Sequence, residues 1–266
     1  MGNNLLFAKK GIIFGALNDK SIAWKTAEKV VEEGGSIVLT NTPLAVRMGD
    51  TARLAERVNA PVIPADATDL NDLENLVDQA MKHFGGRFDF VLHAVGMSMN
   101  IRKGKRYEEA DYQFFSRTLD ISAMSFHKLI RVLYGKDALN DYGSVVSLSY
   151  LAADRAVDGY NDMADAKAML QSVARNFGLL YGRKRHVRIN TISQSPTLTS
   201  AGSGIAGMQR MFEYTDTCSP LGNASAEDCA GLVTALFSDL TRKVTMQNIY
   251  NDGGFSMTVP IPFDHE

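Results

Sequence analysis

The chain has 266 residues, of which 45% are hydrophobic and 22% are charged, and its formal net charge at pH 7 is -2. This composition suits a packed α/β enzyme core and argues against a disordered chain. The charge gives no electrostatic reason to expect a nucleic-acid partner, and the apolar stretch at residues 5–17 is too short to span a membrane.

Short apolar runs alternate along the chain with longer stretches of helical periodicity. The predicted strands cover residues 10–15, 36–41, 60–66, 88–96, 143–149, 187–193 and 248–251. The predicted helices cover residues 21–34, 44–58, 70–84, 108–134, 160–181 and 227–238. Strands separated by helices imply right-handed βαβ units. The sequence therefore predicts a single-domain, Rossmann-like, doubly wound parallel sheet of about seven strands with helices on both faces.

Polar and glycine-bearing strand ends are the candidate ligand site, because ligands of such sheets bind beyond the carboxyl ends of the strands. Gly15 after the first strand allows close approach to a diphosphate, and the N–H groups at Ser21 and Ile22 open a helix. The usual G-x-G-x-x-G is absent, so a plain turn is an equally good interpretation. Asp66 after the third strand can accept a hydrogen bond from an adenine amino group or cap a turn.

Tyr150, Tyr160 and Lys167 give the strongest chemical signal. Seven positions, nearly two helical turns, lead from Tyr160 to Lys167, so the two side chains share a face if they share a helix. A nearby ammonium favours the phenolate, and such a pair can polarise or protonate a carbonyl oxygen. The alternative is that Tyr160 packs beside the sheet while Lys167 extends to water.

Together with several strand ends, these residues resemble the bacterial enoyl-acyl-carrier-protein reductases, which are divergent short-chain dehydrogenases. The matching residues are Gly15, Ser21 to Ala23, Asp66, Ala67, His93 to Gly96, Leu148 to Leu151, Tyr160, Asn161, Lys167 and Asp252 to Ser256. Ordinary short-chain dehydrogenases place three residues between tyrosine and lysine, whereas this family and this chain place six. The ordinary lysine position holds Ala164 here.

The resemblance implies NADH-dependent reduction of the trans-2 double bond of enoyl thioesters in type II fatty acid biosynthesis. It implies catalytic roles for Tyr150, Tyr160 and Lys167, with Tyr160 donating a hydrogen bond to the thioester oxygen. The implied cofactor-binding residues are Gly15, Ser21, Ile22, Thr42, Asp66, Ala67, Val95, Gly96, Lys167, Pro196, Thr197, Leu198 and Thr199. The implied substrate-binding residues are Ser98, Tyr150, Tyr160, Ala201 and Ile205. The implied partners are enoyl-acyl carrier protein as substrate and further copies of the chain in a homotetramer.

The turn after the second strand predicts the choice of cofactor. Thr40, Asn41 and Thr42 should meet the adenosine ribose, and none of them is an acid or a cation. A 2′-phosphate at this turn would lack charge-assisted hydrogen bonds, so we expect NADH to be preferred over NADPH. Arg47, five residues beyond Thr42, opposes this preference if it folds back to the turn.

Residues 197–217 are predicted to form a mobile lid over the acyl site. Glycines at 202, 204 and 207 weaken helical structure. An apolar face is still offered by Ile205, Met208, Met211 and Phe212. The resemblance places substrate beside this segment. The alternative is an ordinary surface helix with a glycine-rich lead.

The other candidate reactive side chains receive no chemical role. No His, Cys or carboxylate cluster has metal-ligand spacing, so we expect no metal. Cys218 and Cys229 are expected to be reduced thiols of a cytoplasmic protein. His93 and His127 lie in apolar surroundings and are expected in the core.

Two other functions stay open. A short-chain dehydrogenase acting on a ketone or alcohol would use Ser147 before Tyr160, but it would lack the lysine expected at position 164. A non-catalytic nucleotide-sensing protein can have the same fold, although it would not need an intact Tyr160 and Lys167. Loss of NADH absorbance with a crotonyl thioester, compared with a panel of ketones, separates the three.

Overall fold

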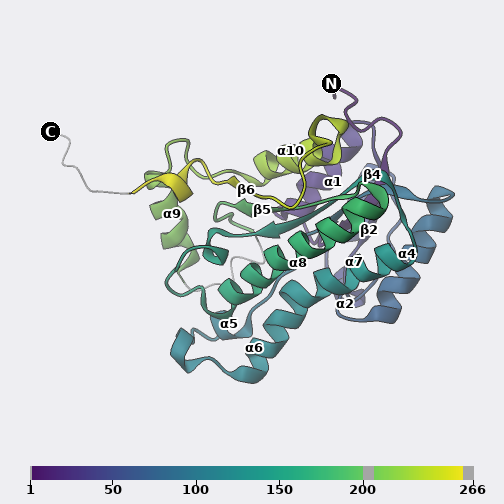
Figure 1. Ribbon diagram of the computed structural model, residues 1–266. Helices are drawn as coiled ribbons and strands as arrows, with labels where there is room; N and C mark the ends of the chain where they lie inside the picture. The colour runs from purple at the N-terminus through teal and green to yellow at the C-terminus, as the bar shows by residue number, and fades with distance from the viewer. Residues whose placement is uncertain (1, 200–206, 260–266) are drawn as a thin grey trace.

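The sheet contains six parallel strands in a computed structural model that describes residues 2–199 and 207–259. Its strands are β1 (Lys10–Phe14), β2 (Ser36–Thr40), β3 (Phe88–His93), β4 (Leu139–Ser149), β5 (Arg188–Gln194) and β6 (Asn248–Asn251). Their order is β2-β1-β3-β4-β5-β6, and each neighbouring pair is parallel. Figure 1 shows helices on both faces of this sheet, which confirms the doubly wound fold.

The predicted strand at residues 60–66 is wrong. This segment forms one isolated bridge, between Val62 and Leu39, alongside the edge strand β2. Pro61 and Pro64 have no N–H group to donate, and proline is confined to the edges of sheets. The segment therefore runs along the edge without becoming a seventh strand.

Helices cover the sheet in two layers (Figure 1). On one face, α1 (Ile22–Glu32) packs against α10 (Ala226–Phe237). The other face carries α4 (Leu70–Phe84), α7 (Ser125–Gly135) and α8 (Asn161–Arg185). The remaining helices are α2 (Pro43–Met48), α3 (Thr51–Val58), α5 (Met99–Arg102), α6 (Tyr112–Leu119) and α9 (Met208–Cys218). Within the described ranges, no helix is long and apolar enough to cross a membrane.

The central strands build two separate cores. In β1, Ile12 and Phe14 join the core beneath α4, α7 and α8, whereas Ile13 joins the core beneath α1 and α10. Successive side chains of a strand point to opposite faces, so a strand covered on both faces must be apolar at every position. This accounts for the unbroken apolar runs in the sequence.

Two long predicted helices are interrupted. The helix expected at 44–58 is divided into α2 and α3, because Gly49 between them is extended. The helix expected at 108–134 consists of a short turn at Tyr107–Glu109, then α6, a π-helical turn at Asp120–Met124, and α7. A new helix begins at α6 because the Asp111 side chain accepts hydrogen bonds from its first N–H groups.

Strand order reverses between β1 and β3, whose register pairs Phe14 with His93. Gly15 follows β1 with a φ angle of 94°. A Cβ atom added at Gly15 would lie 2.2 Å from the carbonyl oxygen of Ala94, so glycine is required for this close approach. The reversal creates the crevice in which doubly wound folds bind ligands.

Candidate functional site

Two adjoining cavities open at the carboxyl ends of the central strands. Five residues line both of them: Ile22, Gly96, Leu148, Lys167 and Thr199. The Gly15 cavity is otherwise lined by Gly15, Leu17, Asn18, Ser21, Ala23, Asn41, Ala45, Ala94 and Val95. The Tyr160 cavity is otherwise lined by Met97, Ser98, Ile101, Arg102, Ser149, Tyr150, Tyr160, Met163, Gln194, Ser195, Pro196, Thr197, Met208 and Met211. The shared wall makes them one elongated cleft.

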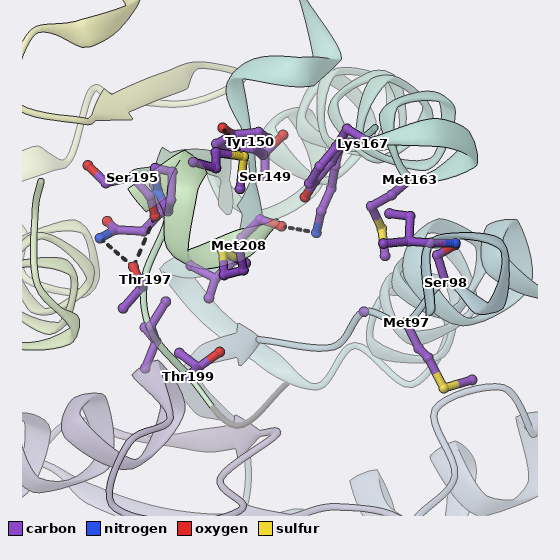
Figure 2. A pocket seen from close by; sticks show the side chains of 18 of the residues that line it. Met97, Ser98, Ser149, Tyr150, Met163, Lys167, Ser195, Thr197, Thr199 and Met208 are labelled. Atoms are coloured by element: carbon purple, nitrogen blue, oxygen red, sulfur yellow. Dashed lines mark hydrogen bonds between the residues drawn. The ribbon is translucent and has the colours of Figure 1, made fainter. Parts of the chain in front are cut away.

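Tyr160 and Lys167 reach this cleft from the first turns of α8. Tyr160 immediately precedes the helix and Lys167 lies within it, and both line the Tyr160 cavity. The Lys167 Nζ donates a 2.7 Å hydrogen bond to the carbonyl oxygen of Leu148, the dashed line beside Lys167 in Figure 2. Burial lowers the pKa of Lys167 to about 8. The amine is thus held at the wall that the two cavities share.

The Tyr160 hydroxyl is a neutral donor. Burial raises its pKa above the ordinary value of 10.0, and the neighbouring Tyr150 adds to the shift. A nearby ammonium favours the phenolate, but here burial is the largest cause of the shift, and it favours the neutral hydroxyl. Within residues 2–199 and 207–259, the Tyr160 hydroxyl has no hydrogen-bond partner. It can therefore donate to a ligand.

Tyr150 packs against Tyr160 and faces α9. The two ring centroids are 4.7 Å apart, and the Tyr150 hydroxyl donates to the sulfur of Met211 at 3.6 Å. Burial, followed by the charge of Asp252, raises the pKa of Tyr150 to about 12. This hydroxyl is also protonated, but it is already engaged with a side chain of α9.

A buried polar cluster supports the opposite wall of the Tyr160 cavity. Ser98 caps α5 and donates a 2.6 Å hydrogen bond to Oδ1 of Asp162, and Asn100 donates a 2.7 Å hydrogen bond to Oδ2 of the same carboxylate. All three residues are buried. These contacts join α5 to the first turn of α8. Ser98, a predicted substrate residue, lines the Tyr160 cavity, and its substrate role remains a prediction.

The π-helical turn at Asp120–Met124 fixes the loop between β3 and α5. The Ser122 hydroxyl accepts from the Met97 N–H at 3.0 Å and donates to the Met97 carbonyl at 3.2 Å. π-helical turns often occur at functional sites. Here the turn holds Gly96, which belongs to the wall shared by both cavities.

The Gly15 cavity fits a dinucleotide. Ser21 caps α1 through a hydrogen bond that its Oγ accepts from the Trp24 N–H, and Ile22 is the first helical residue. The partial positive charge of the helix start therefore borders the cavity, where a diphosphate is favoured. Glycine at position 15 leaves backbone rather than a side chain at the strand end.

Most of the predicted cofactor residues lie together at the cleft. Gly15, Ser21, Ile22, Val95, Gly96, Lys167, Pro196, Thr197 and Thr199 all line one or both cavities. Four predicted residues do not line either cavity: Thr42, Asp66, Ala67 and Leu198. The predicted substrate residues Ala201 and Ile205 lie outside the described residues.

Two of these four residues make local hydrogen bonds. The Thr42 Oγ1 accepts from the Ala45 N–H and caps α2, while the neighbouring Asn41 lines the Gly15 cavity. The Asp66 Oδ1 accepts from the backbone and side chain of Thr68, which is the capping alternative for this residue. A cofactor role for Asp66 remains a prediction.

Sequence reasoning missed several residues of the Tyr160 cavity. Met163 follows Tyr160 by one helical turn, a spacing that would have placed both on one face. Met208 and Met211 were expected on the apolar face of the lid segment, and both line this cavity. Arg102, which also lines this cavity, belongs to the basic segment at residues 102–106. The formal net charge of -2 does not reveal this local cluster of cations.

His93 is a core residue, as predicted. Its ring nitrogens lie 2.9 Å from the hydroxyls of Ser147 and Ser125, and burial lowers its pKa to about 3. Ser147 is fully buried, donates to the His93 carbonyl, and lines neither cavity. The ketone or alcohol alternative therefore lacks an accessible serine as well as the lysine at position 164.

The fold and the cleft define a dinucleotide-dependent oxidoreductase with a tyrosine and a lysine at the reacting end. Residues 15–256 match the family model described as Enoyl-(Acyl carrier protein) reductase. The chain therefore belongs to the enoyl-acyl-carrier-protein reductase family. Within the described part of the chain, no group of three or more possible metal ligands occurs.

Individual relatives agree with this family. The chain is 33% identical over 259 residues to Enoyl-[acyl-carrier-protein] reductase [NADH] 2 of Rhizobium meliloti, covering 96% of this chain and 94% of that protein. It is similar to the FabI–NADH complex from Alistipes finegoldii, with 64% identity, a TM-score of 0.94, and coverage of 96% of this chain and 90% of that one. It is also similar to an NAD complex of the reductase from Anaplasma phagocytophilum, with 30% identity, a TM-score of 0.89, and coverage of 97% of each chain.

Proposed function

We propose that this chain is an NADH-dependent enoyl-acyl-carrier-protein reductase that reduces the trans-2 double bond of enoyl thioesters. The observation that carries the proposal is the pairing of a protonated Tyr160 hydroxyl with the buried Lys167 amine at one cavity, next to a helix start suited to a diphosphate. The spacing of Tyr150, Tyr160 and Lys167 and the family match support the same reaction.

The roles of the residues follow from charge. NADH, when bound, supplies a hydride to the β-carbon of the enoyl thioester, and negative charge develops on the thioester oxygen. The Tyr160 hydroxyl, which burial keeps protonated, donates a hydrogen bond to this oxygen. A preorganised donor of this kind stabilises a transition state by about 2.7–4 kcal/mol.

Lys167 and Tyr150 act beside this donor. Lys167 carries positive charge at the shared wall and binds the ribose hydroxyls next to the nicotinamide. Tyr150 packs against the Tyr160 ring and limits the positions that this ring can take. The methionines of the Tyr160 cavity, Met163, Met208 and Met211, give an adaptable apolar surface for an acyl chain.

Five finer points belong to the same proposal. The natural substrate is the thioester of acyl carrier protein, and the chain acts in the cytoplasm within fatty acid biosynthesis. The active form is a homotetramer, which exposed leucines on α8, Leu179 and Leu180, support. Of the lid predicted at 197–217, residues 200–206 lie outside the described residues. We infer a lid role for the α9 part, which the contact between Met211 and Tyr150 supports. Ser195 and Thr197, which line the Tyr160 cavity, influence the choice of acyl chain.

The test is loss of NADH absorbance with crotonyl thioesters of acyl carrier protein and of coenzyme A, compared with a panel of ketones. We expect turnover of the thioesters alone. Turnover of ketones with no thioester activity would favour a short-chain dehydrogenase, and NADH binding without any turnover would favour a nucleotide sensor.

A further inference from the structure

Arg102 places a positive charge at the rim of the Tyr160 cavity. It is the last residue of α5, its side chain is exposed, and it lines this cavity. Lys167 is the other charged residue of the wall, and no carboxylate belongs to the described wall. The ligand of this cavity therefore meets positive charge at both a buried and an exposed position.

The basic side chains at residues 102–106 differ in whether they already bind another group of the protein. Arg106 forms salt bridges with Glu108 and Glu109, and the Lys105 ammonium donates to the Glu109 carbonyl. Arg102 and Lys103 form no salt bridge or side-chain hydrogen bond with any residue in the described ranges. These two adjacent cations are therefore available to an anion from outside the chain.

The anion does not belong to the dinucleotide. Arg102 lines the Tyr160 cavity but not the Gly15 cavity, where the start of α1 provides the site suited to a diphosphate. The other ligand is the thioester. Acyl thioesters of acyl carrier protein and of coenzyme A share a phosphopantetheine arm with a phosphate, and a carrier protein adds its own carboxylates. A guanidinium forms paired hydrogen bonds with either kind of anion.

We propose that Arg102, assisted by Lys103, binds an anionic group of the thioester carrier at the mouth of the Tyr160 cavity. The proposal rests on the proposed function. The contact involves a part of the substrate that does not react, so it contributes to capture and orientation of the thioester rather than to hydride transfer. Positive charge at a rim also speeds the encounter with an anionic partner at low salt.

The experiment compares three crotonyl substrates: the carrier-protein thioester, the coenzyme A thioester, and the N-acetylcysteamine thioester, which has no phosphate. For Arg102→Gln we expect kcat/KM to fall about tenfold with an anionic carrier, the loss of roughly one charge-assisted hydrogen bond, and to stay unchanged with N-acetylcysteamine. Arg102→Lys should retain most of the wild-type value. Lys103→Gln should lose less than Arg102→Gln.

Lys82→Gln is the matched control, because Lys82 is exposed at the end of α4 and lines neither cavity. Equal thermal midpoints and NADH affinities show that the variants are intact. A selective loss with both anionic thioesters assigns the contact to the phosphate, and a loss with the carrier protein alone assigns it to the carrier's carboxylates. Loss with all three substrates, with coenzyme A alone, or with none overturns the proposal.

The control reaction of the wild type separates this inference from the proposed function. If the wild-type protein reduces none of the three thioesters, the proposed function fails. If the wild type reduces all three and Arg102→Gln behaves like Lys82→Gln, the proposed function stands and Arg102 has no role in binding the carrier.

Discussion

Replacing Tyr160 by phenylalanine removes only the hydroxyl group, so it should affect the rate of hydride transfer and leave NADH binding largely unchanged. We expect Tyr160→Phe to lower kcat by a factor of about 100 to 1000, the usual cost of losing one donor to a developing oxyanion. The dissociation constant of NADH should change little, because the hydroxyl is directed to substrate. Stopped-flow turnover and fluorescence titration of NADH measure the two quantities. Tyr150→Phe should cost less, since its hydroxyl is engaged with Met211.

The buried Lys167 makes the reaction depend on pH. Its pKa of about 8 means that the ammonium predominates below that pH and is lost above it. If the charged form binds the ribose, NADH affinity and kcat/KM should fall as pH rises through about 8. Lys167→Met should weaken NADH binding and abolish this pH dependence. Unchanged NADH affinity in this variant would exclude the ribose role.

The lowered pKa of Lys167 also makes the folding stability depend on pH. Stability should rise with pH, whereas NADH affinity should fall. The folded pKa of about 8 lies below the ordinary 10.5, so the unfolded chain binds more protons between these two values. The cost of burying the ammonium is therefore complete below about pH 8 and is relieved as pH rises toward 10.5. Comparison of the wild type with Lys167→Met isolates this contribution.

Local spacing made part of the site predictable at the residue scale. Tyr160 and Lys167 lie within two turns of one helix, so their proximity follows from the sequence alone. The protonation state of Tyr160 could not be predicted in the same way, because the hydration of a group depends on distant segments that pack around it. Arg102 was missed for the same reason, since the Asp162 cluster determines where α5 lies.

At the scale of elements, the turn after β2 predicts the cofactor preference. Asn41 lines the Gly15 cavity, Thr42 caps α2, and neither can neutralise a 2′-phosphate. We expect kcat/KM to be roughly tenfold to a hundredfold higher with NADH than with NADPH. Thr42→Arg should shift this ratio toward NADPH. A wild-type preference for NADPH that Arg47→Ala removes would show that Arg47 reaches the phosphate.

The helix α9 is the element expected to move when ligands bind. Its residues are largely exposed, Thr215 is its one buried residue, and it contacts the Tyr160 cavity through Met208 and Met211. Few buried contacts imply a small free energy of local opening. We expect amide exchange of residues 207–218 to slow when NADH and a thioester analogue bind together. Equally slow exchange with and without ligands would argue against a lid, and α4 serves as the internal control.

Element boundaries show where sequence patterns were insufficient. The central strands were predicted because apolar runs bounded by glycine or polar residues describe strands covered on both faces. The segment at 60–66 has the same apolar character, but Pro61 and Pro64 leave it a single bridge at the edge. The break between α2 and α3 depends on one glycine, whose extended conformation the helical pattern does not reveal.

At the scale of the whole molecule, we expect four copies to associate. Leu179 and Leu180 on α8 are 43% and 52% exposed, and Leu180 lines a groove with His127 of α7. Sedimentation should give a mass near four chains of 29.1 kDa. Leu180→Arg should reduce this mass, whereas Leu240→Arg, at an exposed leucine outside these helices, should not. A monomer in the wild type would contradict the proposal.

The wall shared by the two cavities makes their ligands energetically dependent on each other. A dinucleotide that contacts Gly96, Leu148 and Lys167 changes the surface that a thioester meets on the other side. Thermodynamic linkage then requires the coupling to be reciprocal. The factor by which NADH alters the dissociation constant of a saturated thioester must equal the factor by which that thioester alters the dissociation constant of NADH, so either titration alone reports the coupling free energy of the cleft.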